Sequence, residues 1–146
     1  MECIEIRKVE EKDLRGLVDL LVSSVGVNEI KLFKALEERL PSERSLVLLA
    51  KSGKKPVGAI LCTVREESEW SDGKLQGVVE ILMVDEPFRR QGIGRRLFET
   101  SRYWFLGQGV RSVVCHAPAD AEVLHAFLKR YGYSISHFTF LKETET

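Results

Sequence analysis

The stretch ILMVDEPFRRQGIGRRLFE, residues 81–99, decides the fold of this chain. It starts as the apolar end of a predicted strand and runs into a predicted helix, with Gly92 and Gly94 at the junction. Four arginines flank these glycines: Arg89, Arg90, Arg95 and Arg96. Glycines let the backbone approach a ligand closely, and the N–H groups and dipole of a helix N-terminus attract anions. The stretch therefore predicts a phosphate-binding turn.

Three phosphate-binding motifs compete for this turn. A Walker loop needs GxxxxGK[ST], and the sequence contains no such string. A dinucleotide fingerprint needs GxGxxG, but Leu97 stands where the third glycine is required, and the preceding strand is the fourth rather than the first. The spacing RxxGxG over residues 89–94 is the pattern that fits.

The rest of the chain alternates between the periods of strands and helices. Strands are predicted over residues 3–9, 45–51, 56–65, 75–84 and 110–116, and residues 133–142 are predicted to form one long strand or two short ones. Helices are predicted over residues 10–25, 30–40, 93–105 and 118–131. This order predicts a mixed α/β protein with at least six strands. Because no internal repeat and no linker interrupts it, we expect one domain over residues 1–146.

Composition narrows the class of protein. The 22 basic residues balance 22 acidic ones, so bulk charge indicates neither nucleic-acid nor membrane binding. The apolar runs fall short of the roughly 20 residues that cross a bilayer, and the N-terminus does not resemble a signal peptide. The cysteines, Cys3, Cys62 and Cys115, form no CxxC pair, so we expect buried free thiols, no metal site and a cytoplasmic protein.

The strand, the RxxGxG turn and the helix together resemble the signature V-x-P/E-x-x-(R/Q)-x-x-G-x-G/A of the GNAT superfamily of acyl-CoA-dependent N-acyltransferases. Two further stretches resemble that family's opening and its late helix: IRKVEEKDL, residues 6–14, and AEVLHAFLKRYGY, residues 121–133. The resemblance implies a mixed, mostly antiparallel sheet of six to seven strands, splayed between strands 4 and 5, with about four helices. It also implies transfer of an acetyl group from acetyl-CoA to a primary amine by direct attack in a ternary complex.

The resemblance implies a donor site around the turn. The pyrophosphate of acetyl-CoA would meet the backbone N–H groups of residues 90–95, and the strand edge at residues 82–84 would meet the pantetheine amides. The implied acetyl-CoA-binding residues are Leu82, Met83, Val84, Arg89, Arg90, Gln91, Gly92, Ile93, Gly94, Arg95, Asp120 and Phe127. A helix turns about 100° per residue, so the arginines around the turn cannot all face the ligand, and we expect at least one at the solvated surface.

Two residues are candidates for the base that deprotonates the amine. Glu80 interrupts an apolar strand, near the bulge that members of the family carry there, although their commonest site corresponds to Val78. His116 ends the next strand, where members that acetylate protein N-termini can carry a glutamate, and its ordinary pKa lies near neutrality. The sequence leaves both open.

The general acid departs from the family pattern. Many members place a tyrosine four residues before the late glycine, and that position is Leu128 here. Tyr131 and Tyr133 lie nearby, so either another group protonates the leaving thiolate or solvent does. Two alternatives to an enzyme stay open. One is a catalytically inactive acyl-CoA-binding sensor, and the other is a nucleotide-binding module.

The acceptor amine is not identified. The family resemblance assigns its binding to the first two helices, residues 66–74 and the last strands. The loop contains Glu66, Glu67, Glu69, Asp72 and Trp70. Its acidic side chains are compatible with a cationic amine and equally with a solvated loop, and Trp70 would cap the acceptor pocket or pack in a dimer. A small molecule, a peptide or a protein stays possible as acceptor, and a monomer or a homodimer as assembly.

Overall fold

The structure is a computed structural model that describes residues 3–116, 122–136 and 140–144. The chain forms two compact units, residues 1–115 and 116–146, which are described separately. The first unit contains a five-stranded sheet with the order β1-β2-β3-β4-β5. Its strands are β1 (Ile4–Lys8), β2 (Ser45–Ser52), β3 (Lys55–Glu66), β4 (Leu75–Val84) and β5 (Ser112–Cys115). Neighbours pair antiparallel except β4 and β5, which pair parallel, so the mixed, mostly antiparallel sheet is confirmed.

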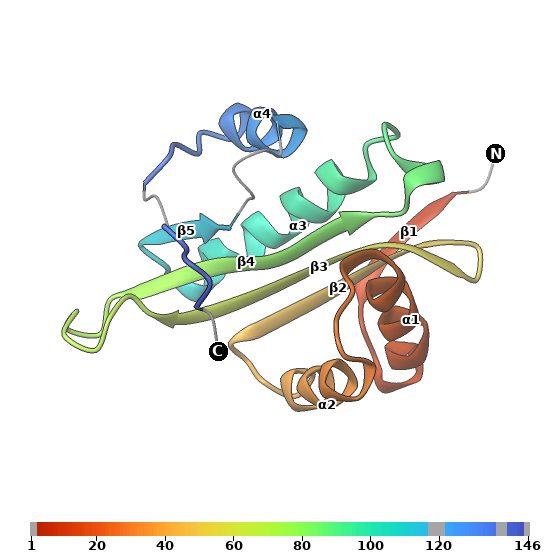
Figure 1. The fold of residues 1–146 in the computed structure, drawn as a ribbon, viewed down its shortest axis with the longest axis horizontal. Helices are drawn as coiled ribbons and strands as arrows, with labels where there is room; N and C mark the ends of the chain where they lie inside the picture. The colour runs from red at the N-terminus through yellow and green to blue at the C-terminus, as the bar shows by residue number, and fades with distance from the viewer. Residues whose placement is uncertain (1–2, 117–121, 137–139, 145–146) are drawn as a thin grey trace. The chain divides into compact units, whose positions relative to one another are not determined.

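Three helices complete the first unit (Figure 1): α1 (Leu14–Val25), α2 (Glu29–Arg39) and α3 (Ile93–Gln108). The short 3-10 turns η1 (Glu11–Asp13) and η2 (Glu86–Phe88) precede α1 and α3. Gly26 ends α1 in the left-handed region with φ of 68°, and the Asn28 side chain caps α2 by accepting from the Lys31 N–H at 3.0 Å. The predicted break between the helices at residues 10–25 and 30–40 is therefore a helix stop followed by a helix start.

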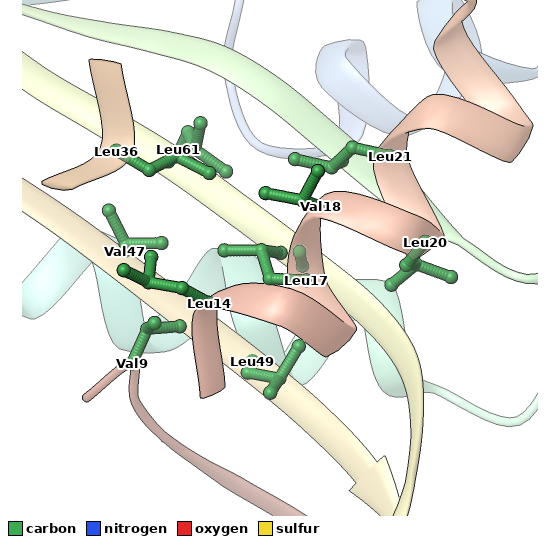
Figure 2. Close-up of a cluster of buried hydrophobic side chains, with 11 residues drawn as sticks. Val9, Leu14, Leu17, Val18, Leu20, Leu21, Leu36, Val47, Leu49 and Leu61 are labelled. Atoms are coloured by element: carbon green, nitrogen blue, oxygen red, sulfur yellow. The ribbon is translucent and has the colours of Figure 1, made fainter. Parts of the chain in front are cut away.

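α1 and α2 cover one face of the sheet with a single apolar cluster (Figure 2). Its buried members are Val9, Leu14, Leu17, Val18, Leu20, Leu21, Leu36, Val47, Leu49, Ala59 and Leu61. Alternate residues of β2 and β3 point into this cluster, because successive side chains of a strand face opposite sides. The remaining alternate residues face α3, so the central strands are buried on both sides.

α3 packs so closely on the sheet that β4 needs a glycine beneath it. A Cβ atom on Gly77 would lie 2.5 Å from two ring carbons of Phe105.

We expect Gly77→Ala to lower the free energy of unfolding by about 1–3 kcal/mol, because the ring must move out of a filled core. Thermal denaturation measures this loss. Gly107 on α3 is the matched control, since a Cβ there has nothing within 4 Å. Gly107→Ala should leave the melting temperature unchanged or raise it. Equal stability of the two variants would contradict this packing.

The second unit contains α4 (Glu122–Arg130), which is followed by a turn at Gly132. Gly132 has φ of 85°, and the Leu128 carbonyl accepts from the Tyr131 and Tyr133 N–H groups at 3.0 and 3.1 Å. The predicted start of this helix at residues 118–120 lies outside the described residues.

The strand predicted over residues 133–142 is not found in the described part of that segment, residues 133–136 and 140–142. The described sheet therefore has five strands rather than six to seven. Alternating apolar residues make a strand only when a neighbouring strand takes its hydrogen bonds, which the alternation itself does not supply. Among the helices that the structure describes, none combines the length and apolar character needed to cross a membrane.

Candidate functional site

The turn between β4 and α3 has the backbone geometry of an anion cradle. Arg90 has φ of 65° and Gly92 has φ of 80°, while Gln91 between them does not have positive φ. Alternating signs of φ turn successive N–H groups to the same side and form a concavity that binds anions. For Arg90 the left-handed conformation is uncommon, since it is not glycine, and marks a constrained position.

The N–H groups of this cradle are open. Within the described part of the chain, no acceptor is found for the backbone N–H groups of residues 90–95. Arg96 is the first residue of α3 whose N–H is taken, by the Gly92 carbonyl at 3.0 Å. These donors stand at the positive end of a 16-residue helix. A bound anion would satisfy them and meet the helix dipole at once.

The two glycines of the motif have different roles. Gly92 is the left-handed N-cap of α3, and a Cβ there would meet nothing within 4 Å, so its side faces open space. A Cβ on Gly94 would stand 3.6 Å from Val84 Cγ2, an ordinary contact. The left-handed backbone conformation therefore favours glycine at position 92, whereas position 94 has room for one methyl group.

The arginines around the turn divide between different sites. Arg89 Nε donates to the Val84 carbonyl at 2.9 Å and so closes the end of β4. Arg96 Nη1 donates to the Ile4 carbonyl at 3.1 Å. Arg95 and Arg96 line an open groove of about 650 Å³ between α3 and strands β1 and β2. The Arg95 backbone N–H belongs to the cradle while its side chain belongs to this groove.

The sheet opens next to the cradle. β5 pairs with β4 only from Gln76 to Val79, where Val79 is opposite Cys115. Residues 80–84 of β4 have no strand on this edge in the described structure, which is the expected splay between strands 4 and 5. Leu82, Met83 and Val84 are half-buried along this open stretch and lead directly to the cradle.

A β-bulge lies where the splay begins. The register of β3 against β4 runs from Cys62 opposite Val79 to Leu61 opposite Ile81, so Glu80 is the extra residue. The bulge expected in this segment is therefore present and has Glu80 at its centre. Ile81 packs with Leu61 against the α1 and α2 cluster. A bulge re-aims side chains, and here it places the carboxylate on the same side as α2.

The Glu80 carboxylate is held by Arg39, the last residue of α2. Arg39 Nη2 donates to Glu80 Oε2 at 2.9 Å, and Arg39 Nη1 donates to Glu80 Oε1. The side chains are 32% and 28% exposed, so the pair is partly shielded from water. Nothing in the sequence indicated Arg39, because an arginine in the last turn of a helix normally complements the helix dipole.

The cysteines lie in different environments. Burial raises the pKa of the Cys62 thiol to about 12 and also raises the pKa of Cys115. Both thiols are therefore neutral near pH 7, and neutral thiols are poor nucleophiles. The expectation of buried thiols is confirmed for Cys62 alone, because Cys115 is half-buried and Cys3 is exposed near the start of an edge strand.

The other predicted site residues belong to the second unit. His116 is its first residue, directly after β5, and Phe127 lies on α4 with its ring centroid 5.1 Å from that of Tyr131. Leu128 occupies the turn of α4 where many family members have the tyrosine. Asp120 lies outside the described residues.

The loop between β3 and β4 is tied to the start of β5. Glu67 pairs with Arg111 at 3.3 Å, so one of its acidic side chains serves a contact within the protein. Trp70 at its tip is 84% exposed. The loop is thus anchored by Glu67 near its start and exposes the Trp70 ring to solvent at its tip.

The whole chain has known relatives by family and by fold. Residues 14–133 match the acetyltransferase (GNAT) family model, whereas curated protein sequences give no match. The fold resembles that of aminoglycoside N-acetyltransferase AAC(6')-Iy in complex with CoA, with TM-score 0.85 and 15% identity over 100% of this chain and 97% of that chain. It also resembles glucosamine-6-phosphate N-acetyltransferase from Arabidopsis thaliana, with TM-score 0.78 and 20% identity over 99% and 100%. A ribosomal-protein-alanine N-acetyltransferase from Brucella melitensis biovar Abortus 2308 gives TM-score 0.74 and 17% identity over 97% and 100%. The family match covers most of the sequence, and the chain belongs to the acetyltransferase (GNAT) family.

Proposed function

We propose that this protein is an N-acetyltransferase that transfers the acetyl group of acetyl-CoA to a primary amine by direct attack in a ternary complex. The observation that carries the proposal is the row of open N–H groups at residues 90–95, directly after the unpaired stretch of β4. The family match at residues 14–133 spans both compact units, and we propose that they act as one domain over residues 1–146.

The proposed donor site has two parts. The pyrophosphate accepts from the N–H groups of residues 90–95, with Gly92 leaving the approach free. The pantetheine amides pair with the open edge at residues 82–84, as an added strand would. Asp120 and Phe127 are further coenzyme-binding residues that we propose on the family resemblance alone. The side chains of Arg89 and Arg95 have other sites, so Arg90 is the arginine best placed to add charge near the phosphates.

The reaction needs a group that takes a proton from the acceptor. An ammonium acceptor loses one proton, its amine nitrogen forms a bond to the thioester carbon, and the carbon–sulfur bond breaks. The amide, CoA thiol and one released proton are the products, so the nitrogen gives up two protons in all. We propose the Glu80 carboxylate as the first proton acceptor, directly or through a water molecule, with His116 as the alternative base.

Direct attack is favoured over an acetyl-cysteine relay. A relay needs a thiolate beside the thioester, and the cysteines nearest the splay are Cys62 and Cys115. Burial raises the pKa of both thiols, which keeps them protonated at neutral pH. The amine itself is then the better nucleophile.

The leaving thiolate has no tyrosine at the family position, because Leu128 stands there. A thiol with an ordinary pKa near 8.5 is a tolerable leaving group without a general acid. We propose that solvent or a neighbouring group supplies this proton. The three free cysteines suit a reducing compartment, in line with a cytoplasmic enzyme.

The acceptor is proposed to be an amine of a small molecule or of a polypeptide. The three structural relatives named above carry, in their names, an aminoglycoside, an amino sugar phosphate and a ribosomal-protein alanine. All three acceptors present a primary amine. Each relative shares at most 20% identity with this chain, so the fold supports the amine class and no single acceptor.

The proposal is tested by thiol release from acetyl-CoA with a panel of polyamines, amino sugars, aminoglycosides and peptide N-termini. We expect one acceptor class to release thiol and to gain an acetyl group by mass spectrometry. Tight CoA binding without thiol release on any acceptor would instead support an acyl-CoA sensor. Competition by ATP or NAD, but not by CoA, would support a nucleotide-binding module and overturn the proposal.

A further inference from the structure

The Arg39–Glu80 pair joins two distant parts of the chain at the point where the sheet opens. Arg39 is the C-terminal residue of α2, and Glu80 is 41 residues later, at the bulge of β4. Glu80 also follows Val79, the last residue of β4 that pairs with β5. The contact is therefore centred on the first unpaired position of the splay.

The geometry of the contact fixes the carboxylate on two points. A guanidinium in a fork-to-fork arrangement uses two parallel N–H donors and restricts both the position and the rotation of the carboxylate. A carboxylate offers about four lone-pair sites, so the fork leaves about two of them unused. Glu80 can hold an ammonium group or a water molecule while Arg39 still grips it.

The Glu80 side chain is 28% exposed, so an acceptor amine or a water molecule can reach its carboxylate while Arg39 holds it. A fixed carboxylate can accept a proton or bind an ammonium in one orientation. A lone glutamate on an exposed bulge would instead sample several rotamers.

We infer that Arg39 is a positioning residue for acetyl transfer, which holds the Glu80 carboxylate aimed at the acceptor amine. The inference rests on the proposed function and adds to it a residue from α2 that acts through Glu80. A purely structural ion pair would stabilise the contact between α2 and β4 whichever of the two carried the carboxylate. A positioning role instead requires the carboxylate to be on β4.

The test uses the full chain with the best acceptor from the thiol-release panel. We expect Arg39→Gln to lower kcat about ten- to a hundredfold, because a reacting group that is out of position slows the reaction by about this factor. The KM for acetyl-CoA should change by no more than about twofold. Arg39→Lys keeps the charge without the fork and should recover part of the loss. Arg7→Gln is the matched control, since Arg7 pairs with Asp13 at 2.5 Å and lies on β1, the edge of the sheet opposite β5. Its kcat should equal that of the wild type.

The charge-reversed double variant, Arg39→Glu with Glu80→Arg, separates the two roles. It retains an ion pair between α2 and β4 but moves the carboxylate from the strand to the helix. We expect its melting temperature to recover relative to Arg39→Gln while kcat stays at the level of Glu80→Gln. If the melting temperature and kcat both recover, the pair is purely structural and the inference is overturned. Full activity of a folded Arg39→Gln variant would also overturn it. An inactive wild type would refute the proposed function instead, so the two failures are distinguishable.

Discussion

Glu80→Gln should lower kcat for acetyl transfer about a hundred- to ten-thousandfold, which is the usual contribution of a general base. The substitution removes the charge and the basic site while keeping the length of the side chain. The glutamine oxygen can still accept from Arg39, so the contact that is lost is one arm of the fork. Saturating both substrates in the thiol-release assay measures kcat directly, and the KM for acetyl-CoA should stay nearly unchanged.

Glu5→Gln is the control for this prediction. Glu5 also pairs with an arginine, Arg7, but on β1, at the edge of the sheet opposite β5. Its kcat should match the wild type. If folded Glu80→Gln keeps full activity while His116→Ala loses it, then His116 is the base and the assignment of Glu80 is wrong. If neither substitution changes the acidic limb of the pH–rate profile, where a general base becomes protonated, the base lies elsewhere.

Gly92→Asp should raise the KM for acetyl-CoA by about a hundredfold or more, with a smaller effect on kcat. The new carboxylate would stand before the open N–H groups of the cradle and would repel the phosphates that they are proposed to bind. Charge-assisted hydrogen bonds contribute about 1.5–3 kcal/mol each, so losing two of them accounts for a factor of this size. Isothermal titration with CoA should show the same loss of affinity.

Gly109→Asp separates this effect from backbone strain. Gly109 closes the other end of α3 with φ of 71°, and a Cβ there also meets nothing within 4 Å. The two substitutions share the left-handed strain and the added charge, but only one stands at the cradle. Gly109→Asp should therefore lower stability and leave the KM for acetyl-CoA unchanged. Equal rises in KM for the two variants would refute the anion site.

Much of the first unit follows from local patterns. The strand predicted over residues 75–84 is found over those residues, and the stop and start at Gly26 and Asn28 fall in the predicted break. These features depend on periodicity and on side chains that bond to the backbone within a few residues. The segment at residues 133–142 shows the limit of periodicity, because its alternation is strand-like and its described residues form no strand.

The arginines illustrate what spacing cannot decide. The four stand at residues 89–96, and the helical turn of 100° per residue already implied that they could not share one target. The structure assigns the Arg89 side chain to the Val84 carbonyl and that of Arg96 to the Ile4 carbonyl. Both acceptors are backbone groups, and the second lies 92 residues away, so no motif could have pointed to it.

By itself the sequence determined the anion cradle, because a glycine with positive φ, a strand end and a helix start are all encoded within about ten neighbouring residues. It also determined that a carboxylate interrupts the fourth strand. Only the tertiary structure decided what that carboxylate does: the register of β3 against β4 makes Glu80 a bulge, and α2 brings Arg39 to it. Strand register and helix placement depend on packing between distant segments, and local spacing carries no information about either.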